Sequence, residues 1–111
     1  DRKEEIARVF NYRNLVITGI FTHLCAADVR TAEKEKFTMG QAAAFDHVIC
    51  DLNKRGLNCG KIHLLFSDGL LQYPELAGDY ARVGIALYGV LSQGADMESL
   101  RLFWLRSSGG K

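Results

Sequence analysis

The sequence predicts an α/β fold in which parallel strands are covered by helices. Three short apolar runs at residues 15–22, 61–66 and 81–88 are candidate strands, and they are apolar on both sides. Two stretches with helical spacing of apolar residues, 2–12 and 31–55, alternate with the first two runs. This order of helices and strands is typical of βαβ connections between parallel strands.

The two predicted helices differ in length and in the clarity of their apolar face. The first depends on Ile6, Val9 and Phe10, which recur at helical spacing with charges between them. The second is longer, and we expect it to end at Gly56. Its apolar stripe consists of Phe37, Gln41, Ala44, Phe45, Val48, Ile49 and Leu52. Four of these are expected in the helix core: Phe37, Phe45, Val48 and Leu52.

The remaining chain indicates that these elements are part of a larger domain. Residues 67–79 are predicted to form a loop, which contains the only proline, Pro74. Three strands and two helices can neither cover both faces of a parallel sheet nor close a barrel, which takes about eight strands and roughly 250 residues. We therefore expect the chain, which opens on Asp1, to be cut from a longer protein.

Composition and charge exclude several classes of protein. The 111 residues carry 14 Lys and Arg against 13 Asp and Glu, so a net charge of +1 leaves no basic surface for nucleic acid or an anionic membrane. No apolar run approaches the ~20 residues of a membrane span, and no signal region opens the chain. We expect this domain to be cytoplasmic.

The cysteines and two of the histidines give no sign of a metal site or a disulfide framework. Cys25, Cys50 and Cys59 are odd in number and form no C-x-x-C pair, so we expect small core or loop residues in a reducing compartment. His47 is expected on the solvated side of the long helix, and His63 has no partner at metal-ligand spacing.

Ser67 is a candidate for binding an anion. It stands just beyond a predicted strand, where its hydroxyl and nearby backbone N–H groups can meet a phosphate, and Gly69 permits a turn there. Gly84 lacks a Cβ, which lets a ligand approach the main chain. The alternative is that Ser67 only begins an ordinary turn.

Arg82 lies inside an apolar run, where a permanently charged guanidinium is costly to bury unless it is paired or serves a ligand. Two structural alternatives remain open. Its side chain could extend to solvent from a strand end, or it could pair with a carboxylate such as Asp79.

Two motifs in this order resemble the bacterial alanine racemases. Residues 19–28 read G-I-F-T-H-L-C-A-A-D, which is similar to the family's G-x-x-T-H-x-x-x-A-D. Residues 82–89 read R-V-G-I-A-L-Y-G, which is similar to R-x-G-I-A-x-Y-G. The resemblance covers residues 15 to about 100 and is strongest to the serine/alanine racemases of vancomycin-resistant bacteria.

The resemblance implies a fold and a cofactor site. The family's domain is a (β/α)8 TIM-like barrel that binds pyridoxal 5'-phosphate, of which this chain would be a fragment. Ser67 would hydrogen-bond the phosphate together with the backbone N–H groups of Gly84 and Ile85, and Arg82 would face the pyridine nitrogen. His23 would pack beside the cofactor and hydrogen-bond Arg82. Without the resemblance, a strand-end histidine satisfied by backbone is the favoured interpretation of His23.

The resemblance also implies an activity: interconversion of L- and D-alanine, or of L- and D-serine, for cell-wall precursor synthesis. The parent protein would be a homodimer, and a membrane anchor on it is left open. The family's cofactor lysine and opposing tyrosine match no residue here, so no catalytic residue is assigned and the chain alone is expected to be inactive. The alternatives are a non-catalytic barrel protein that binds pyridoxal phosphate and a structural remnant without cofactor.

The resemblance stops abruptly near the C-terminus. We expect residues 1–101 to be the central part of the barrel and residues 102–111 to be a tail outside the family. One hypothesis is that this tail is translated out of frame.

Overall fold

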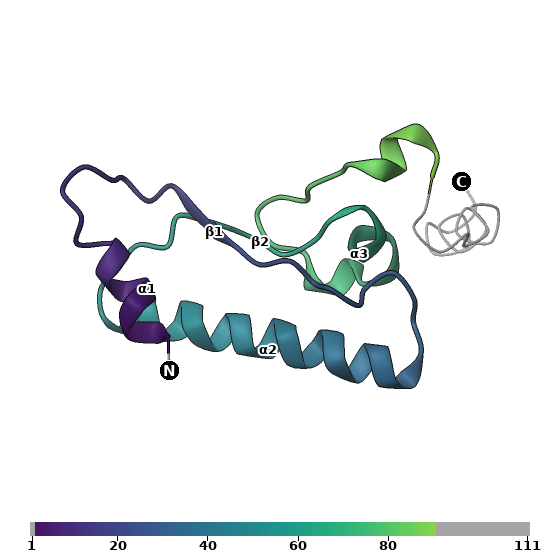
Figure 1. The fold of residues 1–111 in the computed structure, drawn as a ribbon, viewed down its shortest axis with the longest axis horizontal. Helices are drawn as coiled ribbons and strands as arrows, with labels where there is room; N and C mark the ends of the chain where they lie inside the picture. The colour runs from purple at the N-terminus through teal and green to yellow at the C-terminus, as the bar shows by residue number, and fades with distance from the viewer. Residues whose placement is uncertain (1, 91–111) are drawn as a thin grey trace.

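The computed structural model describes residues 2–90, which form helices packed against a short parallel sheet (Figure 1). The predicted tail at 102–111 lies outside the described residues. In chain order the elements are α1 (Lys3–Val9), β1 (Gly19–Phe21), α2 (Ala32–Lys54), β2 (Lys61–His63), α3 (Ser67–Gln72), and the 3-10 helices η1 (Pro74–Leu76) and η2 (Ile85–Tyr88).

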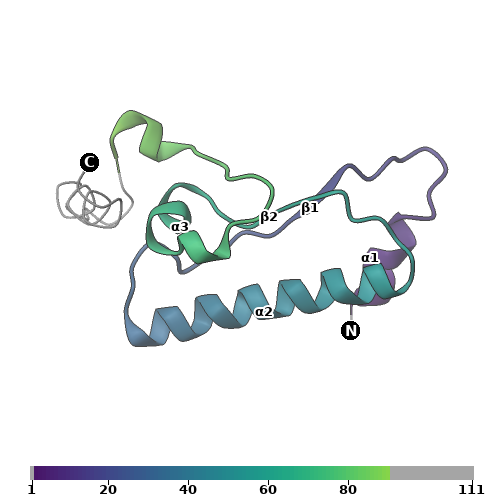
Figure 2. The ribbon, with the colours of Figure 1, turned by 180° about the vertical axis from the view of Figure 1, so that it is seen from behind.

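The sheet is parallel, as predicted, with α2 as the connection. β1 and β2 pair in register from Gly19 with Lys61 to Phe21 with His63. Both views show α2 running along one side of the two strands (Figures 1 and 2). A helix that crosses over between parallel strands in this way covers one face of the sheet.

The first predicted strand, residues 15–22, is longer than the observed one, Gly19–Phe21. Within the described residues, no chain pairs with the other edge of β1. Leu15 and Val16 are therefore left 52% and 87% exposed, although their side chains favour a buried strand. Of the apolar run at residues 15–22, only Gly19–Phe21 pairs with β2, and this segment forms an edge of the sheet in the described residues.

The predicted third strand, residues 81–88, is wrong in most of its length. Arg82 makes a single parallel bridge with Phe66, and Ile85–Tyr88 is a 3-10 helix. The predicted loop 67–79 is also more ordered than expected, because it contains α3 and η1. A side chain takes the place of a neighbouring strand here, because the N–H groups of Gly84 and Ala86 both donate to the hydroxyl of Ser67.

The predicted bounds of the long helix are confirmed. The Thr31 hydroxyl accepts a hydrogen bond from the Lys34 N–H over 3.3 Å, which caps the start of α2. At the other end Gly56 adopts φ +75°, a left-handed conformation that L side chains rarely take and that stops the helix.

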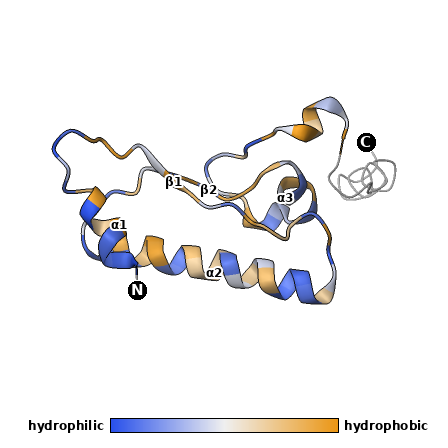
Figure 3. Ribbon diagram, viewed as in Figure 1, coloured by the Kyte–Doolittle hydropathy of each residue, from blue (hydrophilic) through white to orange (hydrophobic). Residues whose placement is uncertain are grey.

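One face of α2 forms most of the core together with the loops around the strands. Figure 3 shows the helix alternating between hydrophobic and hydrophilic residues, and the apolar residues of the two strands are Ile20, Phe21 and Ile62. The prediction that Phe37 belongs to the core is wrong, because its side chain is 53% exposed. Phe45 and Leu52 are buried and Val48 is partly buried, as expected. The buried face of α2 consists of Thr38, Ala42, Phe45, Ile49 and Leu52.

The cysteines, all free thiols, follow the expectation of core or loop positions only in part. Cys59 is buried and Cys25 is exposed in a loop, but Cys50 is exposed on α2, so the expectation is wrong for Cys50. His47 is exposed, as expected. Among the described residues no three His, Cys, Asp or Glu side chains gather to hold a metal, and no helix is long and apolar enough to cross a membrane.

Candidate cofactor site

The predicted site residues lie at one edge of the sheet, beyond the carboxyl ends of its strands. His23 follows β1 and Ser67 follows β2. Arg82 is tied to the same edge, because its backbone N–H donates to the carbonyl of Leu65 over 2.9 Å. Gly84 and Ile85 come next in the chain. Ligands of parallel α/β proteins bind at this edge, where the loops after the strands meet.

Ser67 is the first residue of α3 and is 3% exposed. Its Oγ accepts hydrogen bonds from the N–H groups of Gly84 (2.9 Å) and Ala86 (3.2 Å). A hydroxyl has two acceptor lone pairs and one proton, so both lone pairs are used and the O–H remains to donate. Within the described residues neither this O–H nor the N–H of Ile85 has an acceptor.

The Arg82 guanidinium is held by carbonyls and an aromatic ring. Its Nη2 donates to the backbone oxygens of Thr22 (2.6 Å) and Leu64 (3.3 Å), and its Cζ lies 4.7 Å from the centre of the Phe21 ring. Its Nε is buried without a partner in the described part of the chain. These contacts fix the side chain while leaving a buried donor unused.

The Asp79 alternative for Arg82 is not the arrangement that forms. The Asp79 carboxylate instead accepts from the backbone N–H of Ile62 at 2.8 Å and lies 3.4 Å from Lys61 Nζ. The Ile62 N–H, and then Lys61, lower the pKa of Asp79 below its usual range. Arg82 therefore has no carboxylate partner among the described residues.

His23 lies beside the site but does not make the predicted hydrogen bond to Arg82. Its ring stacks on Phe66, with centroids 4.6 Å apart, and its side chain is exposed. The carbonyls of Thr22 and Leu64 take the guanidinium in its place. Across residues 2–90, no backbone group hydrogen-bonds the imidazole either.

Sequence reasoning missed several groups at this site. The Ala86 N–H and the Leu64 carbonyl are backbone atoms, and side-chain identity gives no signal for them. Phe21 could have been found, because side chains two residues apart on a strand share a face and His23 was already a candidate.

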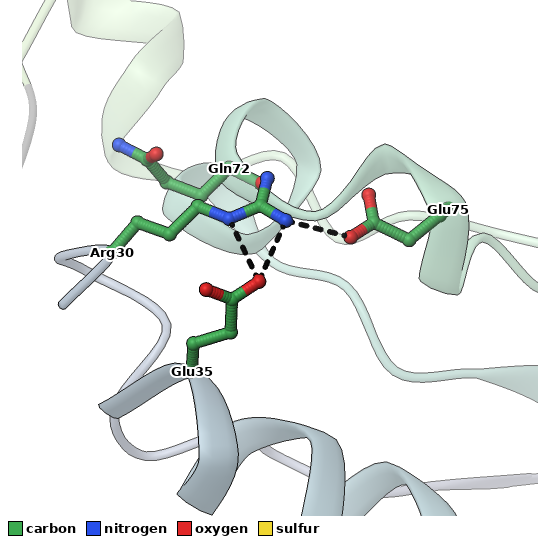
Figure 4. Close-up of polar contacts among 4 residues, drawn as sticks. All are labelled: Arg30, Glu35, Gln72 and Glu75. Carbon is green, nitrogen blue, oxygen red and sulfur yellow. Dashed lines mark hydrogen bonds and ion pairs between the residues drawn. The ribbon is translucent and has the colours of Figure 1, made fainter. Parts of the chain in front are cut away.

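Arg30 also escaped sequence reasoning, although it ties α3 to the rest of the fold (Figure 4). Its guanidinium donates to Glu35 (2.9 Å), to Glu75 (3.3 Å) and to the carbonyl of Gln72 (2.9 Å). It also lies 4.9 Å from the centre of the Tyr73 ring. The contacts join the start of α2 to the end of the helix that begins at Ser67, and those to Gln72 and Glu75 link residues 42 and 45 apart in sequence.

Comparison with known proteins identifies the family. Residues 1–92 match the family described as "Alanine racemase, N-terminal domain". The chain belongs to this family. It is 38% identical over 87 residues to an amino-acid racemase of Enterococcus faecalis, covering 78% of this chain and 12% of that protein. It is also 38% identical over 89 residues to a serine/alanine racemase of Enterococcus gallinarum, covering 80% and 13%.

Solved alanine racemases have the same fold over this segment. The alanine racemase of D-cycloserine-producing Streptomyces lavendulae gives a TM-score of 0.68 at 24% identity, over 80% of this chain and 24% of that one. The enzyme of Corynebacterium glutamicum gives 0.62 at 25% identity, over 86% and 25%. The chain thus spans a quarter or less of each of these relatives and corresponds to part of the alanine racemase N-terminal barrel domain.

Proposed function

We propose that this alanine racemase family chain is a segment of an amino-acid racemase and forms part of its pyridoxal phosphate site. Members of the family use this cofactor. The observation that carries the proposal is a set of three donors without acceptors at one edge of the sheet in residues 2–90: the Ser67 O–H, the Ile85 N–H and the Arg82 Nε. A phosphate and a pyridine nitrogen are acceptors, so the residues fit the group.

Each residue has a defined task in this proposal. Ser67 donates its free O–H and Ile85 its free N–H to the phosphate, while Gly84, whose own N–H donates to Ser67 Oγ, lines the phosphate cradle without a Cβ. Arg82 faces the pyridine nitrogen, and His23 packs beside the ring. Bound pyridoxal phosphate supplies an electron sink for a carbanion at the substrate's α-carbon. A guanidinium has no lone pair to accept and gives up no proton, so Arg82 leaves the ring nitrogen unprotonated and the sink weak. A weak sink suits racemisation, because it disfavours side reactions of a long-lived carbanion.

The proposal assigns the acid–base chemistry to groups outside this chain. Racemisation takes a proton from one face of the α-carbon and returns one to the other, which needs two bases. No residue here matches the family's cofactor lysine or its opposing tyrosine. We therefore expect no racemisation by the chain alone. We propose that the whole protein is a homodimeric, cytoplasmic barrel that racemises alanine or serine for cell-wall precursor synthesis.

The test is a titration of the purified chain with pyridoxal 5'-phosphate, followed by its absorbance. We expect saturable binding that Ser67→Ala weakens about tenfold or more, since a hydrogen bond to a charged group contributes about 1.5–3 kcal/mol. Cys50→Ala, on the exposed side of α2, serves as the matched control and should bind as the wild type does.

Two other outcomes would redirect the assignment. Equal affinity in wild type, Ser67→Ala and Arg82→Ala would favour a structural remnant, in which Ser67 and Arg82 only hold the fold. Measurable racemisation of L-alanine or L-serine by the chain alone would contradict the assignment of both bases to other segments.

A further inference from the structure

The segment that carries Arg82 is aligned with β2 at two points. The Asp79 N–H donates to the carbonyl of Ile62 over 2.7 Å, and the Arg82 N–H donates to the carbonyl of Leu65 over 2.9 Å. Asp79 and Arg82 are spaced along the chain as Ile62 and Leu65 are. The segment therefore runs parallel to β2 in a fixed register, although it forms only one bridge.

Asp79 satisfies both backbone groups of Ile62. Its N–H occupies the Ile62 carbonyl, and its Oδ2 accepts the Ile62 N–H over 2.8 Å, where a parallel neighbour would offer a backbone carbonyl. The preceding residue makes this approach possible, because a Cβ at Gly78 would overlap the carbonyl oxygen of Ile62. Gly78 and Asp79 thus clip the chain to β2 just before Arg82.

This attachment of Gly78 and Asp79 to β2 sets the positions of the site residues that follow. The guanidinium of Arg82 reaches the carbonyls of Thr22 and Leu64 from a backbone held at Leu65. Gly84 reaches Ser67 Oγ two residues later. A slip of this segment would move both contacts together, because one residue of register shifts every following side chain to the other face.

We propose that Asp79 is a positioning residue. It fixes the register of its segment along β2, and so the positions of Arg82 and of the Gly84–Ile85 backbone relative to Ser67. The proposal rests on the proposed function of this same site and adds a residue that sets its geometry. The acceptor atom matters more than the charge, because the Lys61–Asp79 pair is exposed on both sides, at 58% and 38%, and exposed ion pairs contribute little.

Amide hydrogen exchange of the 111-residue chain, read residue by residue, tests the proposal without cofactor. Asp79→Ala should speed exchange at Ile62 and Arg82 about tenfold or more, while Ile49 and Leu52 in α2 keep their rates. Asp79→Asn retains an oxygen acceptor for the Ile62 N–H and should restore slow exchange. Lys61→Met, which removes only the ion pair, should stay within about threefold of wild type.

Pyridoxal phosphate affinity gives the second measurement. Asp79→Ala should weaken binding about tenfold, and Asp79→Asn should recover most of it. Equal acceleration of exchange at all four amides would reduce Asp79 to a general stabilising residue and overturn the proposal. Unchanged exchange at Arg82 in Asp79→Ala would also overturn it, and so would exchange in Asp79→Asn that is as fast as in Asp79→Ala. If the wild type binds no cofactor while exchange responds as expected, the proposed function fails and the positioning role stands.

Discussion

The Gly84 N–H donates to Ser67 Oγ over 2.9 Å, across 17 residues of sequence. This bond joins the first turn of α3 to the segment after Arg82, and the Ala86 N–H donates to the same oxygen at 3.2 Å. Ser67 therefore has two separable tasks. Its lone pairs hold the fold at the edge of the sheet, and its proton is available to a ligand.

The structural task of Ser67 predicts a loss of stability without any cofactor. Ser67→Ala removes the acceptor of two part-buried N–H groups and should lower the free energy of unfolding by about 1 kcal/mol. Ser67→Thr keeps the hydroxyl and should lose less. Urea denaturation with an unchanged m-value measures the difference, and an alanine variant as stable as wild type would show that water replaces the hydroxyl without cost.

The face of α2 that forms the core predicts opposite results for two substitutions. Leu52 is 0% exposed, so Leu52→Ala should cost about 2–5 kcal/mol by leaving a cavity. Phe37 is 53% exposed, and Phe37→Ala should change stability by about 0.5 kcal/mol or less. Thermal denaturation of both variants compares them, and similar losses would mean that Phe37 is covered.

The same pair of residues shows how far sequence alone reached. Apolar periodicity located α2, and the glycine at position 56 located its end. Both signals depend on residues close together in the sequence. It placed Phe37 in the core because the predicted stripe starts at Phe37 and Gln41 and omits Thr38, a polar side chain that is completely buried. Which of two adjacent stripes faces the sheet is decided by tertiary packing.

Each residue of the candidate site has its own signal in the sequence: Ser67 follows a predicted strand, Arg82 lies in an apolar run and Gly84 lacks a Cβ. The structure brings the three together at one edge of the sheet through hydrogen bonds that the sequence did not predict. The third strand failed because Ser67 Oγ and the Asp79 carboxylate take backbone donors that a ladder would have used. Side chains that replace backbone partners leave no periodic signal in a sequence.

Thiol reactivity should divide the cysteines into two classes. Cys25 and Cys50 are exposed, whereas Cys59 is 3% exposed and burial raises the pKa of its thiol. We expect two thiols to react quickly with a disulfide reagent at pH 8 and one to react only on unfolding. Cys59→Ser should remove the slow phase alone, and three equally fast thiols would contradict the burial of Cys59 in the core.

Acid should weaken the attachment of the Asp79 segment. Because the folded-state pKa of Asp79 is lowered, by the Ile62 N–H first and then by Lys61, its contribution is present above the unfolded value and is lost as pH falls through the folded one. Unfolding midpoints in urea should decline below about pH 4. Asp79→Asn should flatten part of this decline. Arg55→Met should flatten another part, since Arg55 lowers the pKa of Glu4.

The Tyr73 hydroxyl predicts a substitution that does no harm. Tyr73 is 0% exposed and its OH is buried without a partner in the described residues, while its ring lies under the Arg30 guanidinium. Tyr73→Phe keeps the ring and removes a polar group that is costly to bury, so stability should stay equal or rise by up to about 1 kcal/mol.

Arg30→Met is the matched change on the other side of this contact. It removes the cation–π contact and the hydrogen bonds to Gln72, Glu35 and Glu75, and it should cost about 1 kcal/mol because the glutamates are 42% and 47% exposed. Urea midpoints of the two variants separate the contributions of ring and hydroxyl. A loss above about 1 kcal/mol in Tyr73→Phe would mean that the hydroxyl is hydrogen-bonded after all, and the end of α3 would then be held by more than Arg30.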